Sequence, residues 1–208
     1  MAAGILSTIV AVLIGLSWGY MRGFLGEVVG FIVNLFLVIP GLPLMIVIAA
    51  YLQNGGILMI IAVIVVTGWA WGARVLRSQT QSLRGNDFVT SAQFSGDSRA
   101  RIVFREILPN MTSIIAGTLF GAATAAILAE AGLEFLGLGD SSIVSWGTML
   151  YWAQNSNSLL TGQWLLLFAP GLCIALLALS LTLINFGVDG ISNPVSYTHL
   201  TLPTNREV

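Results

Sequence analysis

Lysine is absent from this chain of 208 residues, and charged residues of any kind make up only 8% of it. An ordinary soluble domain carries roughly 25% charged residues, so this sequence is too poor in charge for a water-facing surface. The absence of lysine also excludes a P-loop nucleotide site, because that motif needs a lysine to reach the phosphates. If the protein works with ATP, a partner chain must hydrolyse it.

Cysteine and histidine are almost as scarce, with one residue of each. Cys173 lies inside an apolar run, and a single cysteine permits neither an internal disulfide nor a cysteine cluster for a metal ion. His199 lies in a C-terminal stretch of different composition. We therefore expect no metal site, no cofactor and no histidine-based catalysis, and we expect that the chain is not an enzyme.

Hydrophobic residues make up 56% of the chain and gather in long runs. Runs of about twenty residues cross a hydrocarbon core of roughly 30 Å as helices, and these runs lack the alternating pattern of a barrel strand. The fold class is therefore an all-α integral membrane protein, with the lipid bilayer as its solvent. Five spanning helices are predicted, at Ala3–Tyr20, Val28–Leu52, Ile57–Ala73, Met111–Ala131 and Leu159–Phe186.

The arginines predict which side of the membrane each connection occupies, because positively charged loops stay in the cytoplasm. The first connection carries Arg22, and the third carries six arginines between Arg74 and Arg105. The second connection (53–56) and the fourth (132–158) have none. We therefore expect the third connection and the C-terminus in the cytoplasm and the N-terminus outside. Because no basic flank precedes that outside N-terminus, an upstream helix is expected to be missing.

Prolines interrupt two of the predicted spans, with Pro40 and Pro43 in the second and Pro170 in the fifth. A proline inside a spanning helix removes a backbone hydrogen bond and kinks the helix. Such a kink either serves packing or lines a translocation path, and the sequence leaves both interpretations open.

The fourth connection, 132–158, is too apolar for a solvated loop. We expect it to lie at the membrane interface or to re-enter the membrane, with Trp146, Tyr151 and Trp152 at headgroup level. It also contains Gly137-Leu-Gly-Asp140, the G-x-G-D sequence of intramembrane aspartyl proteases. That chemistry needs two carboxylates that share a site, and no other aspartate lies in a predicted span, so we do not favour it. Glu130 and Glu134 are better explained as residues at the end of a helix.

The only sizeable hydrophilic stretch, residues 78–110, has a helix–glycine–helix pattern. Asp87–Phe94 is predicted to form a short helix, and Gly96 suits the left-handed position that follows a helix. Asp97 or Ser98 can cap the start of a second helix. That second helix is amphipathic. One apolar face carries Val103 and Ile107, the adjoining apolar face carries Phe104 and Leu108, and a basic face carries Arg101 and Arg105. Pro109 is expected to end it just before the fourth span.

This stretch resembles the EAA loop of bacterial ABC importer permeases, whose pattern is E-A-A-x3-G-x9-I-x-L-P. The matching positions are Ala92, Gly96, Leu108 and Pro109, and the departures are Thr90, Ser91 and Glu106, which stand for the glutamate, the first alanine and the isoleucine. Two further stretches, Glu130–Gly139 leading into Ser145–Leu150 and Asn185–Gly190 followed by Asn193-Pro194, resemble the C-type subunit of dipeptide and oligopeptide permeases.

The resemblance covers residues 1–194, which we expect to form the transmembrane permease domain, the six-helix core of the family without its first helix. Residues Val195–Val208 match no part of the family pattern. They resemble a translated sequencing-adapter read-through, and we expect them to be a non-native tail.

The resemblance implies a permease subunit of an ATP-binding-cassette importer for di- or oligopeptides in a bacterial inner membrane. It implies three kinds of partner besides lipid: a second homologous permease, two cytoplasmic ATPase subunits and an extracytoplasmic substrate-binding protein. In that family the loop docks into a groove of the ATPase, and the positions carried over are Thr90, Ser91, Ala92, Gly96, Arg101, Val103, Arg105, Ile107, Leu108 and Pro109.

Other functions stay open at this point. Relatives of such permeases carry nickel or other small solutes, and a channel or a passive membrane scaffold would also be an apolar bundle with a basic loop. Nucleic acid is not an expected partner, because acidic residues intersperse the arginines and no aromatic residues alternate with them.

Overall fold

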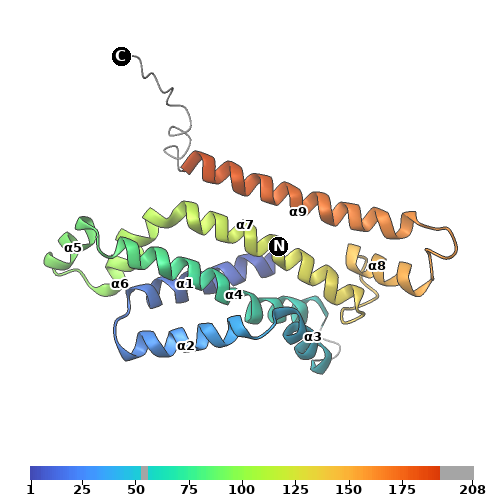
Figure 1. The fold of residues 1–208 in the computed structure, drawn as a ribbon, viewed down its shortest axis with the longest axis horizontal. Helices are drawn as coiled ribbons and strands as arrows, with labels where there is room; N and C mark the ends of the chain where they lie inside the picture. The colour runs from blue at the N-terminus through green and yellow to red at the C-terminus, as the bar shows by residue number, and fades with distance from the viewer. Residues whose placement is uncertain (53–55, 193–208) are drawn as a thin grey trace, which may run out of the picture.

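The computed structural model describes residues 1–52 and 56–192, and every regular element within those ranges is a helix (Figure 1). This confirms the predicted all-α class. The α-helices are α1 (Ala2–Tyr20), α2 (Phe24–Val38), α3 (Gly41–Tyr51), α4 (Gly56–Leu83), α5 (Asp87–Phe94), α6 (Arg99–Arg101), α7 (Thr112–Phe135), α8 (Trp146–Asn155) and α9 (Leu165–Ser192). A π-helical segment, η1 (Ile102–Ile107), and a 3₁₀ segment, η2 (Leu108–Met111), join α6 to α7. The expected non-native tail, 195–208, lies outside the described residues.

Four stretches of the described chain are helical, long and apolar enough to cross a membrane. They are α1, α4, the stretch Arg99–Phe135 that ends in α7, and Leu165–Val188 of α9. The pair α2 and α3 also passes this test when its two helices are taken together. The predicted number of five spans is therefore reached only if this broken pair counts as one span.

The second predicted span, Val28–Leu52, is not one kinked helix, because the chain turns by 87° between α2 and α3. Ile39 leaves the helical conformation (φ −71°, ψ 127°), as expected for a residue that precedes a proline. Pro40 is itself extended and forms the N-cap of α3. Pro43 is the third residue of α3, where a backbone N–H would have no partner inside the helix. The two prolines therefore break the span completely and start a new helix.

Two predicted connections begin later than expected because the helices before them continue past their predicted ends. The third span was predicted to end at Ala73, but α4 runs to Leu83. In its last turns Thr80 is fully buried, and its hydroxyl donates to the carbonyl of Leu76 at 2.8 Å. A buried and satisfied threonine costs the helix little, so the apolar run does not mark its end. Similarly, α7 continues to Phe135.

The last span starts later than predicted, at Leu165 instead of Leu159. The residues before it form turns, with Gly162 at a φ of +76°. A left-handed residue ends a regular helix, so the apolar residues before Gly162 belong to the connection. The helix then continues through Pro170.

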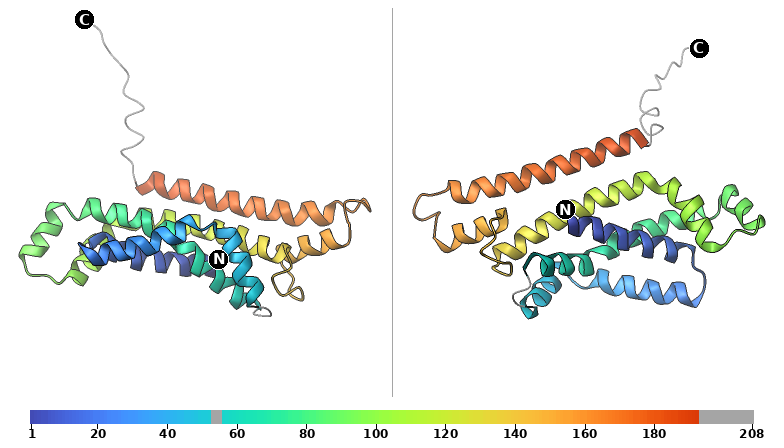
Figure 2. Two further views of the ribbon diagram at one scale, coloured as in Figure 1. Left: turned by 60° about the horizontal axis from the view of Figure 1, so that its bottom comes forward. Right: turned by 180° about the vertical axis from the view of Figure 1, so that it is seen from behind.

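α1 lies in the middle of the bundle and packs against α4 and α7 (Figures 1 and 2). α2 and α3 lie on the α4 side, and α9 lies on the α7 side, where it also contacts α8. The contact between α1 and α4 depends on missing side chains. A Cβ at Gly15 would lie 2.7 Å from the carbonyl oxygen of Ala73, and one at Gly19 would lie 2.5 Å from Cβ of Thr80. Small residues one turn apart let two spanning helices approach at the backbone.

Large apolar side chains cover the outer faces of the bundle. On α9, Phe168, Leu183 and Phe186 are all exposed, and on α2 so are Phe24 and Phe31. Apolar surface of this extent is unstable in water but suits contact with lipid tails. The outer surface thus agrees with an integral membrane protein.

Candidate functional site

The hydrophilic stretch 78–110 begins in the last turns of α4, and the rest of it gathers at one end of the bundle, between α4 and α7 in the chain (Figure 1). Its first helix, α5, has the predicted bounds. Gly96 then adopts the predicted left-handed conformation, with a φ of +80°. The N–H groups of Gly96 and Asp97 donate to the carbonyls of Gln93 and Ala92, both at 3.1 Å. This is a Schellman motif, which satisfies the last carbonyls of a helix and reverses the chain.

The second half of the loop begins with a capped turn. The Ser98 side chain accepts a hydrogen bond from the backbone N–H of Arg101 at 3.4 Å, so Ser98 is the N-cap of α6. Asp97, the other candidate cap, instead forms an ion pair with Arg101 at 2.8 Å. Both groups are outside the protein core, so the pair adds little stability.

Pro109 does not end the second helix, contrary to our expectation. The helical path continues from Arg99 to Phe135 by changing its pitch through η1 and η2. The N–H of Leu108 donates to the carbonyl of Val103, five residues earlier, which is a π-helical bond. Pro109, which has no N–H, is then placed in the 3₁₀ segment. Local changes of this kind let a helix pass a proline without losing its direction.

Val103 and Ile107 share one face, as predicted, but this face points into the protein. Val103 is 5% exposed and Ile107 is fully buried, in a cluster that includes Leu16, Leu76 and Val89 from α1, α4 and α5. The structure therefore turns these two residues toward the bundle, and their place in a partner contact stays a prediction. The physical reason is that α1, α4 and α5 together offer an apolar cluster, and burying the most apolar face of this segment in it is favourable. Val103 and Ile107 attach the loop to the spanning helices.

Other side chains of the loop face outward. Thr90, Ser91, Gly96, Arg101, Arg105 and Pro109 are exposed, whereas Ala92 and Leu108 are half-buried. Phe104 is 44% exposed and Phe94 is 89% exposed. An exposed phenylalanine in an otherwise polar segment is typical of a site that a partner covers. Our sequence analysis did not single out Phe94, although a phenylalanine two residues before the helix-ending glycine was the available signal.

The loop is also held to the first connection. The Arg84 guanidinium donates to the carbonyls of Gly19 and Tyr20, at 3.4 Å each, and so binds the last turn of α1. The amide of Gln93 donates to the hydroxyl of Tyr20 at 3.3 Å. The first and third connections therefore share one end of the bundle. We call this end, which carries Arg22, Arg84, Arg99, Arg101 and Arg105, the arginine-rich end.

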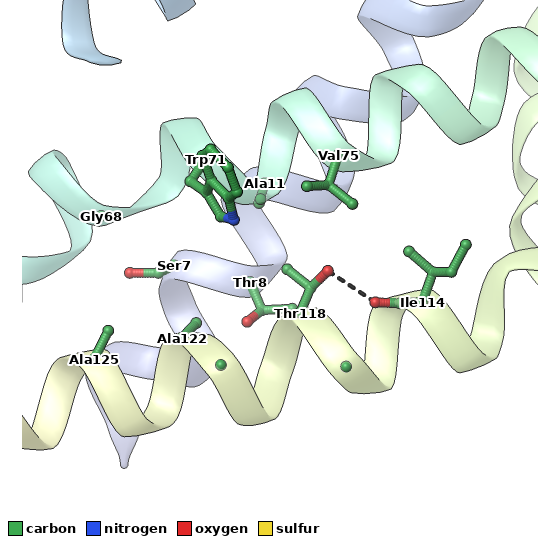
Figure 3. Close-up of a pocket in the computed structure, with 13 residues that line it drawn as sticks. Ser7, Thr8, Ala11, Gly68, Trp71, Val75, Ile114, Thr118, Ala122 and Ala125 are labelled. Carbon is green, nitrogen blue, oxygen red and sulfur yellow. Dashed lines mark hydrogen bonds between the residues drawn. The ribbon is translucent and has the colours of Figure 1, made fainter. Parts of the chain in front are cut away.

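An open groove of about 510 Å³ lies between α1, α4 and α7 (Figure 3). Glycine and alanine form much of its wall, with Ser7, Thr8 and Thr118 as its hydroxyl-bearing residues and Trp71 exposed at its edge. The hydroxyls of Thr8 and Thr118 donate to carbonyls of their own helices, both at 2.8 Å. The Ser7 hydroxyl is buried, and none of the described residues accepts or donates a hydrogen bond to it. The wall thus has neutral polar groups and small side chains, and no titratable residue is among its lining.

At the opposite end of the bundle, the connection between α7 and α9 folds back as α8. Ser145 and Thr148 form a capping box at the start of α8. The Ser145 hydroxyl also donates to the carboxylate of Glu134, which is 6% exposed near the end of α7. Gly147 lies directly against that carboxylate, where a Cβ would be 2.5 Å from its Oε2 atom. Glu134 therefore links α8 to α7.

The aromatic residues of α8 agree in part with a place at the membrane boundary. Trp146 and Trp152 are partly exposed, and Tyr151 packs edge-on against Trp152 with ring centroids 5.3 Å apart. Asp140, just before α8, accepts hydrogen bonds from the hydroxyl and the N–H of Ser142, which lower the pKa of Asp140. A carboxyl held ionised in this way is unlike the shared-proton pair of an aspartyl protease.

The fold and the loop define a helical membrane protein with a polar loop at one end of the bundle, and comparison with known proteins gives the family. The sequence profile of "Binding-protein-dependent transport system inner membrane component" matches residues 11–194. This chain belongs to that family.

Similar proteins with curated names carry peptide-transport descriptions. The oligopeptide transport system permease protein OppC of Mycobacterium tuberculosis is 31% identical over 194 residues, which are 92% of this chain and 66% of that protein. OppC of Bacillus subtilis is 32% identical over 83% of this chain and 58% of its own length. The dipeptide transport system permease protein DppC of the same organism is 29% identical over 92% of this chain and 60% of its own. This chain thus spans slightly less than two thirds of the length of these relatives.

Proposed function

We propose that this chain is a membrane-spanning permease subunit of an ATP-binding-cassette importer, and that its substrates are di- or oligopeptides. Membership of the binding-protein-dependent transport family supports the transporter class. The names of the relatives, oligopeptide and dipeptide transport permease proteins, support the substrate class. The proposed partners are a second homologous permease, two ATPase subunits and an extracytoplasmic substrate-binding protein.

The proposed orientation puts the arginine-rich end in the cytoplasm of a bacterial cell. Seven arginines lie in the first and third connections or in the part of α4 that leads into the third, and the fourth connection has none. Such a difference supports a cytoplasmic location for the arginine-bearing connections. α9 ends on the same side under this topology, so the C-terminus of the permease domain is cytoplasmic.

The loop at the arginine-rich end is the proposed contact with the ATPase. The observation that carries this proposal is the division of the loop into two sides: Val103 and Ile107 are buried in the bundle, while Phe94 and Phe104 are exposed. A segment attached in this way passes a displacement of its outer side to α1 and α4. Closure of the ATPase pair would thereby bias the bundle between its inward-open and outward-open states.

The groove between α1, α4 and α7 is the proposed contribution of this chain to the translocation path. Its small side chains leave room, and its hydroxyl groups can exchange hydrogen bonds with the peptide groups of a passing substrate. A path should bind weakly enough to release its substrate, and a wall of neutral groups meets this requirement.

The test is a Phe94→Ser variant of the full-length subunit, co-expressed with its partner genes. Removing an exposed aromatic anchor from an interface typically costs more than about 2 kcal/mol, so we expect ATPase co-purification and uptake to fall more than about tenfold. Membrane insertion should be unchanged, because Phe94 makes little contact with the bundle.

Phe168→Ser on α9 is the matched control, since Phe168 is also exposed but lies far from the loop in the sequence. It should retain ATPase association. Equal association of the ATPase with the Phe94 variant and the wild type would remove the loop from the proposed interface.

A further inference from the structure

A second pocket, of about 450 Å³, lies at the arginine-rich end between the last turn of α1, α2 and α4. We call it the basic pocket and define it by Trp18, Glu27, Phe31, Asn34 and Arg77, which line it together with glycine backbone. Its wall differs from the neutral groove described above, because it contains a guanidinium group, a carboxylate and an amide. Nothing in the proposed transport mechanism uses these groups.

Arg77 is held in a fixed position but leaves hydrogen-bonding capacity unused. Its guanidinium carbon lies 3.9 Å from the centroid of the Trp18 ring, which is a cation–π contact. The ring itself cannot move freely, because its indole N–H donates to the carbonyl of Gly26 at 2.7 Å and Gly30 packs closely against it. The Nε atom of Arg77 is buried, and it has no hydrogen-bond partner among the residues that the structure describes. A buried guanidinium N–H without an acceptor is costly, so the described residues leave the hydrogen bonds of the half-buried Arg77 side chain incompletely satisfied.

The charges around the pocket do not cancel. Arg74 lies one turn before Arg77 on α4, and its guanidinium donates to the neutral amide oxygen of Asn34. Among the side chains that the structure describes, Arg101 pairs with Asp97, and neither Arg74 nor Arg77 is paired with Glu27. Two guanidinium groups and one carboxylate leave a surplus of one positive charge. The pocket is therefore suited to an anion with several acceptor oxygens.

The position of the pocket along α4 favours one kind of anion. The apolar part of α4, Gly56 to Ala73, has a length of about 27 Å at 1.5 Å per residue, close to the roughly 30 Å of a hydrocarbon core. Arg74 and Arg77 follow directly, at the level of lipid headgroups. Exposed apolar residues of α2, among them Phe31 and Leu35, continue from the pocket and offer a surface to acyl chains.

We propose that the basic pocket binds the phosphate headgroup of an anionic phospholipid, with Arg77 as its main ligand and Arg74 at its mouth. The phosphodiester oxygens accept from the Arg77 guanidinium, and the acyl chains lie along α2. Basic pockets between spanning helices are a known form of lipid recognition. The proposal goes beyond the transport function, and it does not depend on the identity of the substrate.

The test uses the full-length subunit in its assembled transporter, purified in detergent and titrated with phosphatidylglycerol under native mass spectrometry. Wild type should retain this lipid, and Arg77→Gln should weaken its retention about tenfold, as loss of a charge-assisted bidentate contact does. Arg74→Gln should weaken it by about fivefold, and it serves as the second variant if Arg77→Gln does not accumulate. Arg99→Gln is the control, because Arg99 is an exposed arginine of α6 that does not line the pocket.

Three outcomes overturn the proposal. One is retention of phosphatidylglycerol by the Arg77 or Arg74 variant at the wild-type level. Another is equal retention of phosphatidylcholine, which carries no net charge. The third is displacement of the lipid by inorganic phosphate at matched concentration, which would make the pocket a site for a free anion. The transport proposal is tested by ATPase association and uptake, whereas this proposal is tested by lipid retention. A negative result in one measurement therefore does not decide the other.

Discussion

Gly96 shows how one residue sets the geometry of the loop. Its φ of +80° lies in the left-handed region, and no atom lies within 4 Å of the place where a Cβ would be. The requirement for glycine therefore comes from the backbone alone and not from crowding. A β-branched residue resists this conformation most, whereas asparagine tolerates it.

We expect Gly96→Val to strain the turn by about 1–3 kcal/mol and so to displace α5 relative to η1. In the complete transporter, ATPase co-purification and uptake should decrease while membrane insertion is retained. The measurement is ATPase recovered per subunit, with Gly96→Asn as the control that keeps the left-handed turn. If valine and asparagine variants associate equally with the ATPase, the turn does not control the interface.

At the scale of elements, the bundle depends on how closely α1 approaches α4. The two helices meet along a line of small residues on α1 that includes Ala11, Gly15 and Gly19. Lipid tails are as apolar as leucine, so spanning helices associate through close packing instead of through the hydrophobic effect. The same approach positions Trp18 on α1 beside Arg77 on α4.

Gly15→Leu should separate α1 from α4, because its Cβ would lie 2.7 Å from the backbone oxygen of Ala73, which cannot move aside easily. Overpacking of this kind typically costs about 1–3 kcal/mol. We expect a lower thermal unfolding temperature of the purified complex and reduced yield. Gly171→Ala on α9 is the control, since no atom lies within 4 Å of a Cβ there. A Gly15 variant as stable as that control would show that the α1–α4 contact is not tight in the membrane.

The whole molecule has two chemically different ends. One carries the loop and the arginines, and the other carries α8 with its partly exposed tryptophans. The hydrogen bonds from Arg84 and Gln93 to the last turn of α1 keep the first and third connections together. Any topology of this chain must therefore place both connections on the same side.

We expect a cysteine at position 142 to react with a membrane-impermeant reagent from outside intact cells, and a cysteine at position 95 to react only after the cells are opened. Ser142 and Ser95 are both exposed, so accessibility within the protein does not limit the reaction. The native Cys173 is also exposed and must first be replaced by alanine. Labelling at position 95 but not at 142 in intact cells would reverse the proposed orientation.

Local sequence determined a large part of this molecule. Long apolar runs determine a membrane bundle, because lipid requires every backbone group to be bonded within a helix. The Gly96 turn and the bounds of α5 were predicted correctly, since a Schellman motif and a helix cap involve only neighbouring residues.

Only the tertiary structure decided the features that depend on contacts between distant segments. Val103 and Ile107 face inward because α1, α4 and α5 offer them an apolar cluster, which no local pattern reveals. The continuation of α4 to Leu83 and the passage of the helix through Pro109 depend on the same packing, which outweighs the local preference to stop. The basic pocket likewise exists because Trp18 and Arg77, 59 positions apart, are brought together by glycines that let their helices touch.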